Sequence, residues 1–272
     1  MTRRERSFGD ASIVVISGAR GGLGRALAGR FARAGSRVVL LDRDEAAVEA
    51  AAQTLIKAGH VALSLACDVT DIAACEAAIA RAVAQFGRLD VLINNAGITH
   101  RSAFASTSIE VLRHVIEVNL FGAMHLTRAA LPHLIASRGL IVAISSVAGF
   151  TPLIARTGYA ASKHALHGFF ESLRTEVAAE GVDVMLVCPS FIATGIEQHA
   201  LGPTGGAATH EQVVVGGRLQ PDDVADRIFA GAERNRRLLL VGRTARAAWW
   251  LSRLAPALYE RIMARRLRDE MH

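Results

Sequence analysis

Two residue types that are scarce in this chain, tyrosine and lysine, stand four positions apart at Tyr159 and Lys163. The chain has only two tyrosines, and its only other lysine is Lys57. Residues at i and i+4 lie on one face of a helix, so the Lys163 ammonium can lie beside the Tyr159 phenol. A free phenol has a pKa of about 10, and a nearby cation favours its ionised form. The pair is a candidate acid–base group, although a surface pair on an amphipathic helix has the same spacing.

Ser146 precedes this pair and follows an apolar run at residues 140–145. Such a run is typical of a buried parallel strand, and open α/β sheets bind ligands at the carboxyl ends of their strands. We therefore expect the Ser146 hydroxyl at that edge of the sheet, where it can hold the oxygen atom that is protonated.

A strand, a glycine loop and a helix follow one another near the start of the chain. Residues 11–17 are rich in Val and Ile, the loop Gly18-Ala-Arg-Gly-Gly22-Leu-Gly24 comes next, and a helical pattern covers residues 25–34. Glycines let the backbone approach a pyrophosphate, and a helix N-terminus supplies N–H donors to it. The loop is a candidate nucleotide site, and a purely structural turn is the alternative.

The next strand, residues 37–41, ends at Asp42. A carboxylate at this position can accept hydrogen bonds from an adenosine ribose and repel a 2′-phosphate, so Asp42 favours NAD over NADP. Arg43 points the other way, because a guanidinium can stack on adenine or attract that phosphate. Solvated loop charges are the alternative for both residues.

Helical and apolar segments alternate along the rest of the chain. Further strands are expected at 61–66, 89–93, 140–145, 182–187 and 238–241, and helices at 44–58, 72–86, 109–137, 159–180 and 221–235. This alternation predicts an α/β fold, a Rossmann-like doubly wound parallel sheet with helices on both faces, in a single domain. The Gly-rich segment 189–217 has the length and composition of a mobile lid over a site.

Composition narrows the function classes. The 272 residues suffice for one α/β domain, and no apolar run reads as a membrane-spanning helix. Cys67, Cys75 and Cys188 lack metal-ligand spacing, so we expect no metal site and small core residues in a reducing, cytoplasmic compartment. The net charge of +6 is concentrated near the C-terminus and does not indicate a nucleic-acid surface.

The tail, residues 243–272, is basic and amphipathic. Arg residues surround a set of apolar residues in this tail. The apolar residues recur at close to helical spacing: Trp249, Trp250, Leu254, Leu258, Ile262 and Leu267. We expect Pro256 to divide the tail into two short helices and to begin the second. Adjacent tryptophans with flanking Arg suit peripheral contact with an anionic membrane. The competing interpretation is that the stripe packs on the rest of the chain or on a partner subunit.

With these motifs assembled, the chain resembles the short-chain dehydrogenase/reductase family in its shorter, single-domain form. The resemblance covers residues 10–242 and rests on Ser17-Gly18-x-x-x-Gly22-x-Gly24, Asp68, Asn94-Asn95-Ala96-Gly97, Asn119, Ser146, Tyr159-x-x-x-Lys163 and Pro189 to Thr194. It implies an NAD(P)-binding domain over residues 1–242, followed by the tail. Ser17 and Ser190 depart from the usual Thr and Gly. Gly21 stands where NADP-preferring members often carry a basic residue, which strengthens the NAD prediction.

The resemblance also implies roles for the matched residues. Tyr159 is then the general acid/base, and Lys163 its electrostatic partner that also holds the nicotinamide ribose. Ser146 binds the substrate oxygen, and Asn119 supports a proton relay through water. The implied cofactor-binding residues are Ser17, Gly18, Arg20, Gly22, Leu23, Gly24, Asp42, Arg43, Asp68, Val69, Asn95, Ala96, Gly97, Tyr159, Lys163, Pro189, Ile192 and Thr194.

These features predict an NAD-preferring oxidoreductase that interconverts an alcohol and a ketone or aldehyde. Apolar pocket candidates suggest a lipophilic substrate, although core packing is the alternative for half of them: Phe150, Leu153, Ile154, Phe191, Ile192 and Ile196. A cofactor-binding regulatory or scaffold protein, docked to a membrane or partner through its tail, is the alternative function. The helices at 109–137 and 159–180 are apolar over more than one face, which predicts a homodimer or homotetramer.

Overall fold

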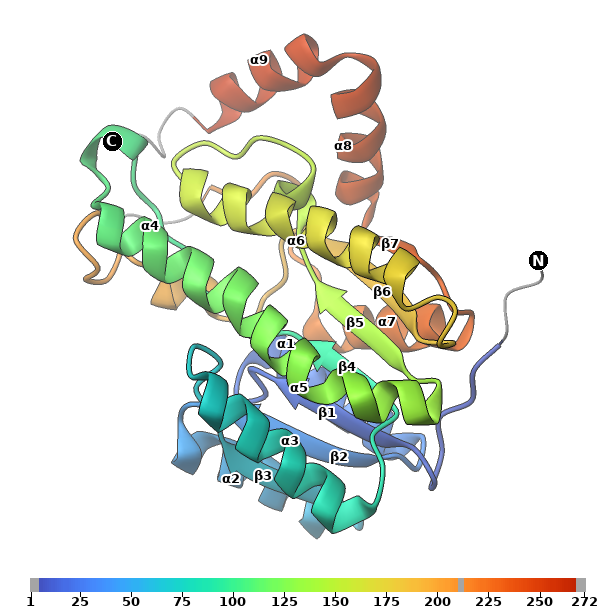
Figure 1. Cartoon of the computed structure of the whole chain (residues 1–272). Coiled ribbons are helices and arrows are strands. Elements are labelled where there is room, and N and C mark those ends of the chain that lie inside the picture. The colour runs from blue at the N-terminus through green and yellow to red at the C-terminus, as the bar shows by residue number, and fades with distance from the viewer. Residues whose placement is uncertain (1–4, 210–212, 268–272) are drawn as a thin grey trace.

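Seven parallel strands form the central sheet of the computed structural model, which describes residues 5–209 and 213–267 (Figure 1). They are β1 (Ile13–Ser17), β2 (Arg37–Asp42), β3 (Ala62–Ala66), β4 (Val91–Asn94), β5 (Leu140–Ile144), β6 (Asp183–Pro189) and β7 (Leu238–Val241). Their order across the sheet is β3-β2-β1-β4-β5-β6-β7. Val15 of β1 pairs with Val39 on one side and Leu92 on the other. The strand order reverses between β1 and β4, and this is where a crevice opens in doubly wound sheets.

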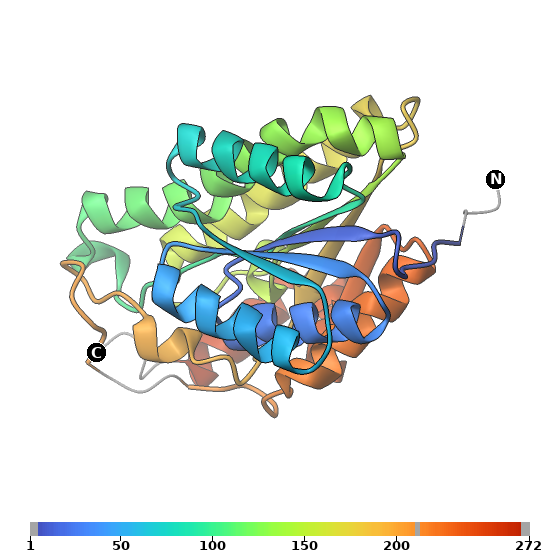
Figure 2. The same ribbon diagram turned by 90° about the horizontal axis from the view of Figure 1, so that it is seen from below.

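Helices cover both faces of the sheet. They are α1 (Gly22–Arg33), α2 (Glu45–Lys57), α3 (Ile72–Phe86), α4 (Ile109–Ile116), α5 (Gly122–Ser137), α6 (Thr157–Glu176), α7 (Pro221–Glu233), α8 (Arg243–Leu254) and α9 (Pro256–Arg266). Figure 2 shows α1, α2 and α7 on one side of the sheet and α3, α5 and α6 on the other. The predicted Rossmann-like, doubly wound fold is confirmed.

The strands are apolar on both sides because both faces are covered. Every residue of β1 and β5 is buried. Val14 and Ile16 join the cluster under α1 and α7, whereas Ile13 and Val15 join the cluster under α3, α5 and α6. The three cysteines are buried, as predicted. The result is a sheet that is buried on both faces, with loops at the carboxyl ends of its strands.

The helix predicted over residues 109–137 is not uniform. A π-helical turn, Glu117–Phe121, joins α4 to α5, with Asn119 at its centre. The Asn119 side chain accepts a hydrogen bond from the Ile98 N–H at 2.8 Å and donates to the Ile98 carbonyl at 3.0 Å. It also donates to Ser162 Oγ at 2.9 Å. Single π turns occur often at functional sites, and this one ties the loop after β4 to α6.

The tail forms two helices that fold back over the chain. Pro256 is the first residue of α9, which confirms the predicted division. Their buried face packs on the segment that follows β5, including Phe150 and Leu153, and consists of Ala248, Tyr259, Met263 and Leu267. Arg268 of the tail and residues 210–212 of the predicted lid lie outside the described residues. Among helices in the described part of the chain, none has the length and apolarity to cross a membrane.

Candidate active site

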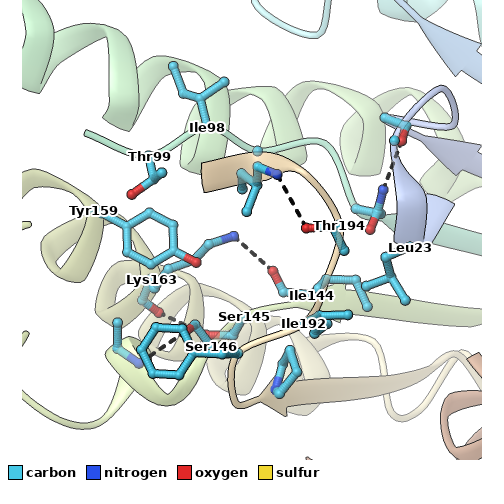
Figure 3. Close-up of a pocket in the computed structure, with 18 of the residues that line it drawn as sticks. Leu23, Ile98, Thr99, Ile144, Ser145, Ser146, Tyr159, Lys163, Ile192 and Thr194 are labelled. Carbon is cyan, nitrogen blue, oxygen red and sulfur yellow. Dashed lines mark hydrogen bonds between the residues drawn. The ribbon is translucent and has the colours of Figure 1, made fainter. Parts of the chain in front are cut away.

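A cavity of about 1150 Å³ opens at the carboxyl edge of the sheet. Its walls are the glycine loop after β1, the loop after β4, the turn after β5, α6 and the segment after β6. Figure 3 shows Tyr159 and Lys163 projecting from α6, Ser146 from the turn after β5, and Thr194 from the facing segment. Parallel strands end at one edge, so motifs far apart in the sequence meet here.

Lys163 lies one helical turn after Tyr159, and the two side chains are neighbours. Lys163 Nζ is 5.7 Å from the centre of the Tyr159 ring. The ammonium donates a hydrogen bond of 2.9 Å to the Ile144 carbonyl at the end of β5 (Figure 3). Burial lowers the pKa of Lys163 to about 8. The hydrogen bond to the end of β5 therefore holds the Lys163 side chain in place, while burial favours its neutral amine over its charged ammonium form.

The electrostatics around Tyr159 differ from the sequence expectation. We expected Lys163 to lower the pKa of the phenol, but burial raises that pKa above its ordinary value. The Ser146 hydroxyl and the charge of Arg156 act in the opposite direction. Arg156 is buried and immediately precedes α6. Sequence reasoning missed Arg156, because one Arg in an Arg-rich chain carries no signal of its own.

Ser146 is oriented by a short 3₁₀ turn, Val147–Gly149. Its Oγ accepts a hydrogen bond from the Ala148 N–H at 3.2 Å. Behind it lies a polar cluster in which His167 Nε2 is 3.1 Å from Ser145 Oγ and 3.4 Å from Cys188 Sγ. Burial lowers the pKa of His167 to about 4, so this ring is neutral at neutral pH. The Ser146 side chain thus projects from a firmly supported turn.

The glycine loop packs too closely for side chains. A Cβ atom at Gly18 would lie 2.8 Å from Ala96 Cα, and one at Gly24 would lie 2.3 Å from the Gly18 carbonyl oxygen. Gly18 also has a φ of +65°, which favours glycine. No side chain caps the N-terminus of α1. An uncapped helix end beneath a bare backbone loop fits the pyrophosphate of a dinucleotide.

Ser17 and Asn119 lie behind the cavity wall and not on it. Ser17 Oγ accepts hydrogen bonds of 3.1 Å from the N–H groups of Asn95 and Ala96. Asn95 in turn donates to the Ser17 carbonyl at 2.9 Å. The Ser17 hydroxyl joins the loops after β1 and β4 and does not line the cavity, and its contact with the cofactor stays a prediction.

Asp42 is nearly buried at the end of β2. Its carboxylate accepts hydrogen bonds of 3.2 Å from the N–H groups of Arg20 and Asp44. The Arg20 guanidinium lies 3.6 Å from Asp42 and 2.9 Å from Asp44, so two carboxylates hold it. Arg43 also lines the cavity. This corner presents a fixed carboxylate together with two cations, one of which is already paired.

The comparisons with known proteins agree with this arrangement. The family model for short chain dehydrogenases matches residues 12–202. The chain belongs to this family. Dehydrogenase/reductase SDR family member 7B of Bos taurus is 40% identical over 275 residues, which cover 98% of this chain and 85% of the bovine protein. The Xenopus laevis protein of the same name is 37% identical and covers 97% of this chain and 84% of its own length.

Solved short-chain dehydrogenases share the fold. One from Burkholderia phymatum, in complex with NAD, has a TM-score of 0.84 at 29% identity and covers 93% of this chain and 96% of its own. A metagenomic short-chain oxidoreductase, in complex with NADP, has a TM-score of 0.71 at 31% identity, with 86% and 98% covered. The present chain is thus a short-chain dehydrogenase/reductase family oxidoreductase with the fold that binds nicotinamide cofactors.

The other expected cofactor residues of this short-chain dehydrogenase line the cavity. They are Gly18, Arg20, Gly22, Leu23, Gly24, Asp42, Arg43, Asp68, Val69, Asn95, Ala96, Gly97, Tyr159, Lys163, Pro189, Ile192 and Thr194. Of the apolar candidates, Leu153, Phe191, Ile192 and Ile196 line it as well, whereas Phe150 and Ile154 pack beneath the tail. Backbone hydrogen bonds tie Leu201 of the predicted lid to Thr99 and Arg101. The mobility of that lid stays a prediction.

Sequence reasoning missed the contribution of the tail to the cavity wall. Eight residues of α8 and α9 line it: Thr244, Ala247, Ala248, Leu251, Tyr259, Ile262, Met263 and Arg266. The apolar stripe predicted from the sequence shares only Ile262 with this wall, and Trp250, Leu254 and Leu258 of that stripe are exposed. Helical spacing alone does not identify the surface that a stripe covers.

Proposed function

We propose that this enzyme interconverts a lipophilic alcohol and its ketone or aldehyde, with NAD as the preferred cofactor. The observation that carries the proposal is the meeting of the Tyr159 phenol, the Ser146 hydroxyl and the Lys163 ammonium at one cavity wall. Apolar side chains also line this cavity, among them Leu153, Phe191 and Ile196 together with residues of the tail helices. Such a cavity suits an apolar molecule that carries one reactive oxygen.

Each polar side chain has a distinct task in this proposal. Tyr159 holds the proton that the substrate oxygen gains or loses, and its raised pKa keeps the phenol protonated at neutral pH. Ser146 orients that oxygen with a hydrogen bond. Lys163, fixed by Ile144, places a cation beside the phenol and stabilises it when it ionises.

The cofactor would be held by the glycine loop, Asp42 and Lys163, with Thr194 at the nicotinamide end. A bound nicotinamide supplies or accepts the hydride. NAD preference is supported by the fixed carboxylate of Asp42, which favours a free ribose hydroxyl over a phosphate. Arg20 is engaged by Asp42 and Asp44, which reduces its availability to a 2′-phosphate.

We also infer a cytoplasmic homodimer or homotetramer, with the tail able to contact a membrane peripherally. The oligomer proposal rests on fewer residues than the sequence suggested. Most of the apolar residues on α5 and α6 face the core, including Leu126, Leu166 and Phe170. Phe121 is exposed, and Leu131 and Phe169 are only partly buried, so these remain for a subunit contact.

The test is turnover of alcohols and ketones of increasing chain length with each cofactor, followed by the absorbance of the reduced nicotinamide. Tyr159→Phe should lower turnover by about 10²–10⁴-fold, because it removes the proton and keeps the ring. Cofactor affinity, measured by fluorescence titration, should change little. Tyr259→Phe is the matched control, since it removes the chain's other phenol, and it should lose far less.

Two outcomes would redirect the proposal. Wild-type turnover by the Tyr159→Phe variant would show that the proton comes from elsewhere. If NAD binds but no alcohol or ketone is turned over, the regulatory or scaffold alternative becomes the better interpretation.

A further inference from the structure

The tail helices carry an outward apolar edge that the cavity does not use. Trp250 and Leu254 lie one turn apart on α8 and are 63% and 78% exposed. Leu258 follows in the first turn of α9, across the bend at Pro256, and is 50% exposed. We call these three residues the elbow patch, because they flank the joint between α8 and α9. Figure 1 shows the two helices that meet at this joint. The elbow patch is separate from the residues that line the cavity.

The opposite side of the same helices is anchored. Successive helical residues point about 100° apart, so the adjacent tryptophans face different ways. Trp249 packs against Phe150, with 4.9 Å between ring centres, and the Arg253 guanidinium lies 3.1 Å from the centre of the Trp249 ring. Tyr259 and Met263 are buried on the inner side of α9. The elbow patch therefore lies on the outer face of two helices whose inner face is packed against the rest of the chain.

Positive charge lies on the same two helices as the elbow patch. The helices α8 and α9 contain six Arg and a single acidic residue, Glu260. All six are exposed: Arg243, Arg246, Arg253, Arg261, Arg265 and Arg266. Within residues 5–209 and 213–267, none of the six forms an ion pair with a carboxylate. The patch thus lies on helices that combine exposed apolar side chains with cations that have no carboxylate partner in the described part of the chain.

We propose that the elbow patch docks the enzyme on an anionic lipid bilayer. Trp and Leu side chains enter the headgroup region of a membrane, and the Arg side chains contact the anionic lipid heads. A second copy of the chain is a poorer occupant. A two-fold contact places the same surface on both sides, and it would set this Arg-rich face against itself.

Docking by this surface has a consequence for the substrate. Ala248, Leu251 and Met263 of the same two helices line the cavity on their inner side. The bilayer would therefore lie against the outer side of the cavity wall. If the proposed lipophilic substrate is correct, it can pass from the membrane to the cavity over a short path, although the docking itself does not depend on that activity.

The test uses the full-length protein and sedimentation with vesicles. The wild type should pellet in low salt with vesicles of phosphatidylcholine and phosphatidylglycerol, and should pellet less in high salt or with phosphatidylcholine alone. The variant W250S/L254S/L258S should bind the anionic vesicles at least about tenfold more weakly. The matched control is I56S/I72S, which removes exposed apolar residues on α2 and α3 and should bind like the wild type.

A second variant guards against misfolding of the first. R246Q/R261Q/R265Q leaves the apolar residues in place and should lose binding at low salt. The proposal is overturned if the wild type stays in the supernatant with every vesicle, or if the elbow variant binds as tightly as the wild type. It is also overturned if light scattering shows that W250S/L254S/L258S splits an oligomer, which would assign the patch to a second copy. Without vesicles, both variants should turn over a short, water-soluble substrate as fast as the wild type does. This measurement separates a failure of the catalytic proposal from a failure of the docking proposal.

Discussion

His100 links protonation to the helix that carries Tyr159 and Lys163. Its buried ring accepts a hydrogen bond of 3.0 Å at Nε2 from the Gly158 N–H, in the first turn of α6. Burial, and then the charge of Arg156, lower the pKa of His100 to about 4. A protonated ring would present a donor to the Gly158 N–H in place of an acceptor. Acidification should therefore weaken the anchoring of α6.

The magnitude follows from the two pKa values. In the unfolded chain the pKa of His100 is the ordinary 6.5, against about 4 in the folded protein. Between these values the unfolded chain binds more protons, so the free energy of unfolding falls as the pH falls. At a pH below both pKa values, the free energy of unfolding should be about 3 kcal/mol lower than at a pH above both. Between about pH 7 and about pH 5, the free energy of unfolding should fall by about 2 kcal/mol.

Urea denaturation followed by circular dichroism at both pH values measures this loss. His100→Gln keeps an acceptor oxygen near Gly158 but cannot titrate, so its stability should fall about 2 kcal/mol less than that of the wild type on acidification. His164→Gln changes an exposed histidine on α6 and should behave like the wild type. Equal losses in the wild type and His100→Gln would refute the link between His100 and α6.

Three further expectations concern the site and the assembly. Ser146→Ala should lower kcat/KM less than Tyr159→Phe does, by the equivalent of about 1–3 kcal/mol, because it removes one hydrogen bond and not the proton; a larger loss than that of Tyr159→Phe would reverse the assigned roles. Asp42→Ala should lower the ratio of the NADP dissociation constant to the NAD dissociation constant, measured by fluorescence titration. If the wild type binds NADP more tightly than NAD, Arg20 or Arg43 decides the cofactor preference. Light scattering at micromolar concentration should give a multiple of 28.9 kDa, and a monomer mass would exclude the oligomer.

The sequence alone determined the fold and most of the cavity wall, because the motifs are local. A strand followed by a glycine loop and a helix specifies its own geometry, and the residues at strand ends share one edge once the strands are parallel. Tyr159 and Lys163 lie on one helix, so their spacing already makes them neighbours. No knowledge of the remaining chain was needed to place them together.

Only the tertiary structure decided what surrounds these residues. Burial raises the pKa of Tyr159, and the Ser146 hydroxyl and the charge of Arg156 oppose that rise. Burial of the phenol and the position of Arg156 both come from the way the segment before α6 packs. Ser17 turned behind the wall because the loop after β4 lies against it. The helical spacing of apolar residues in the tail predicted an amphipathic stripe, but Trp250, Leu254 and Leu258 of that stripe are exposed, and Tyr259 and Met263 are buried instead. Packing assigned one side of α8 and α9 to the cavity and left Trp250 and its neighbours outside, because a helix covers one surface with only part of its circumference.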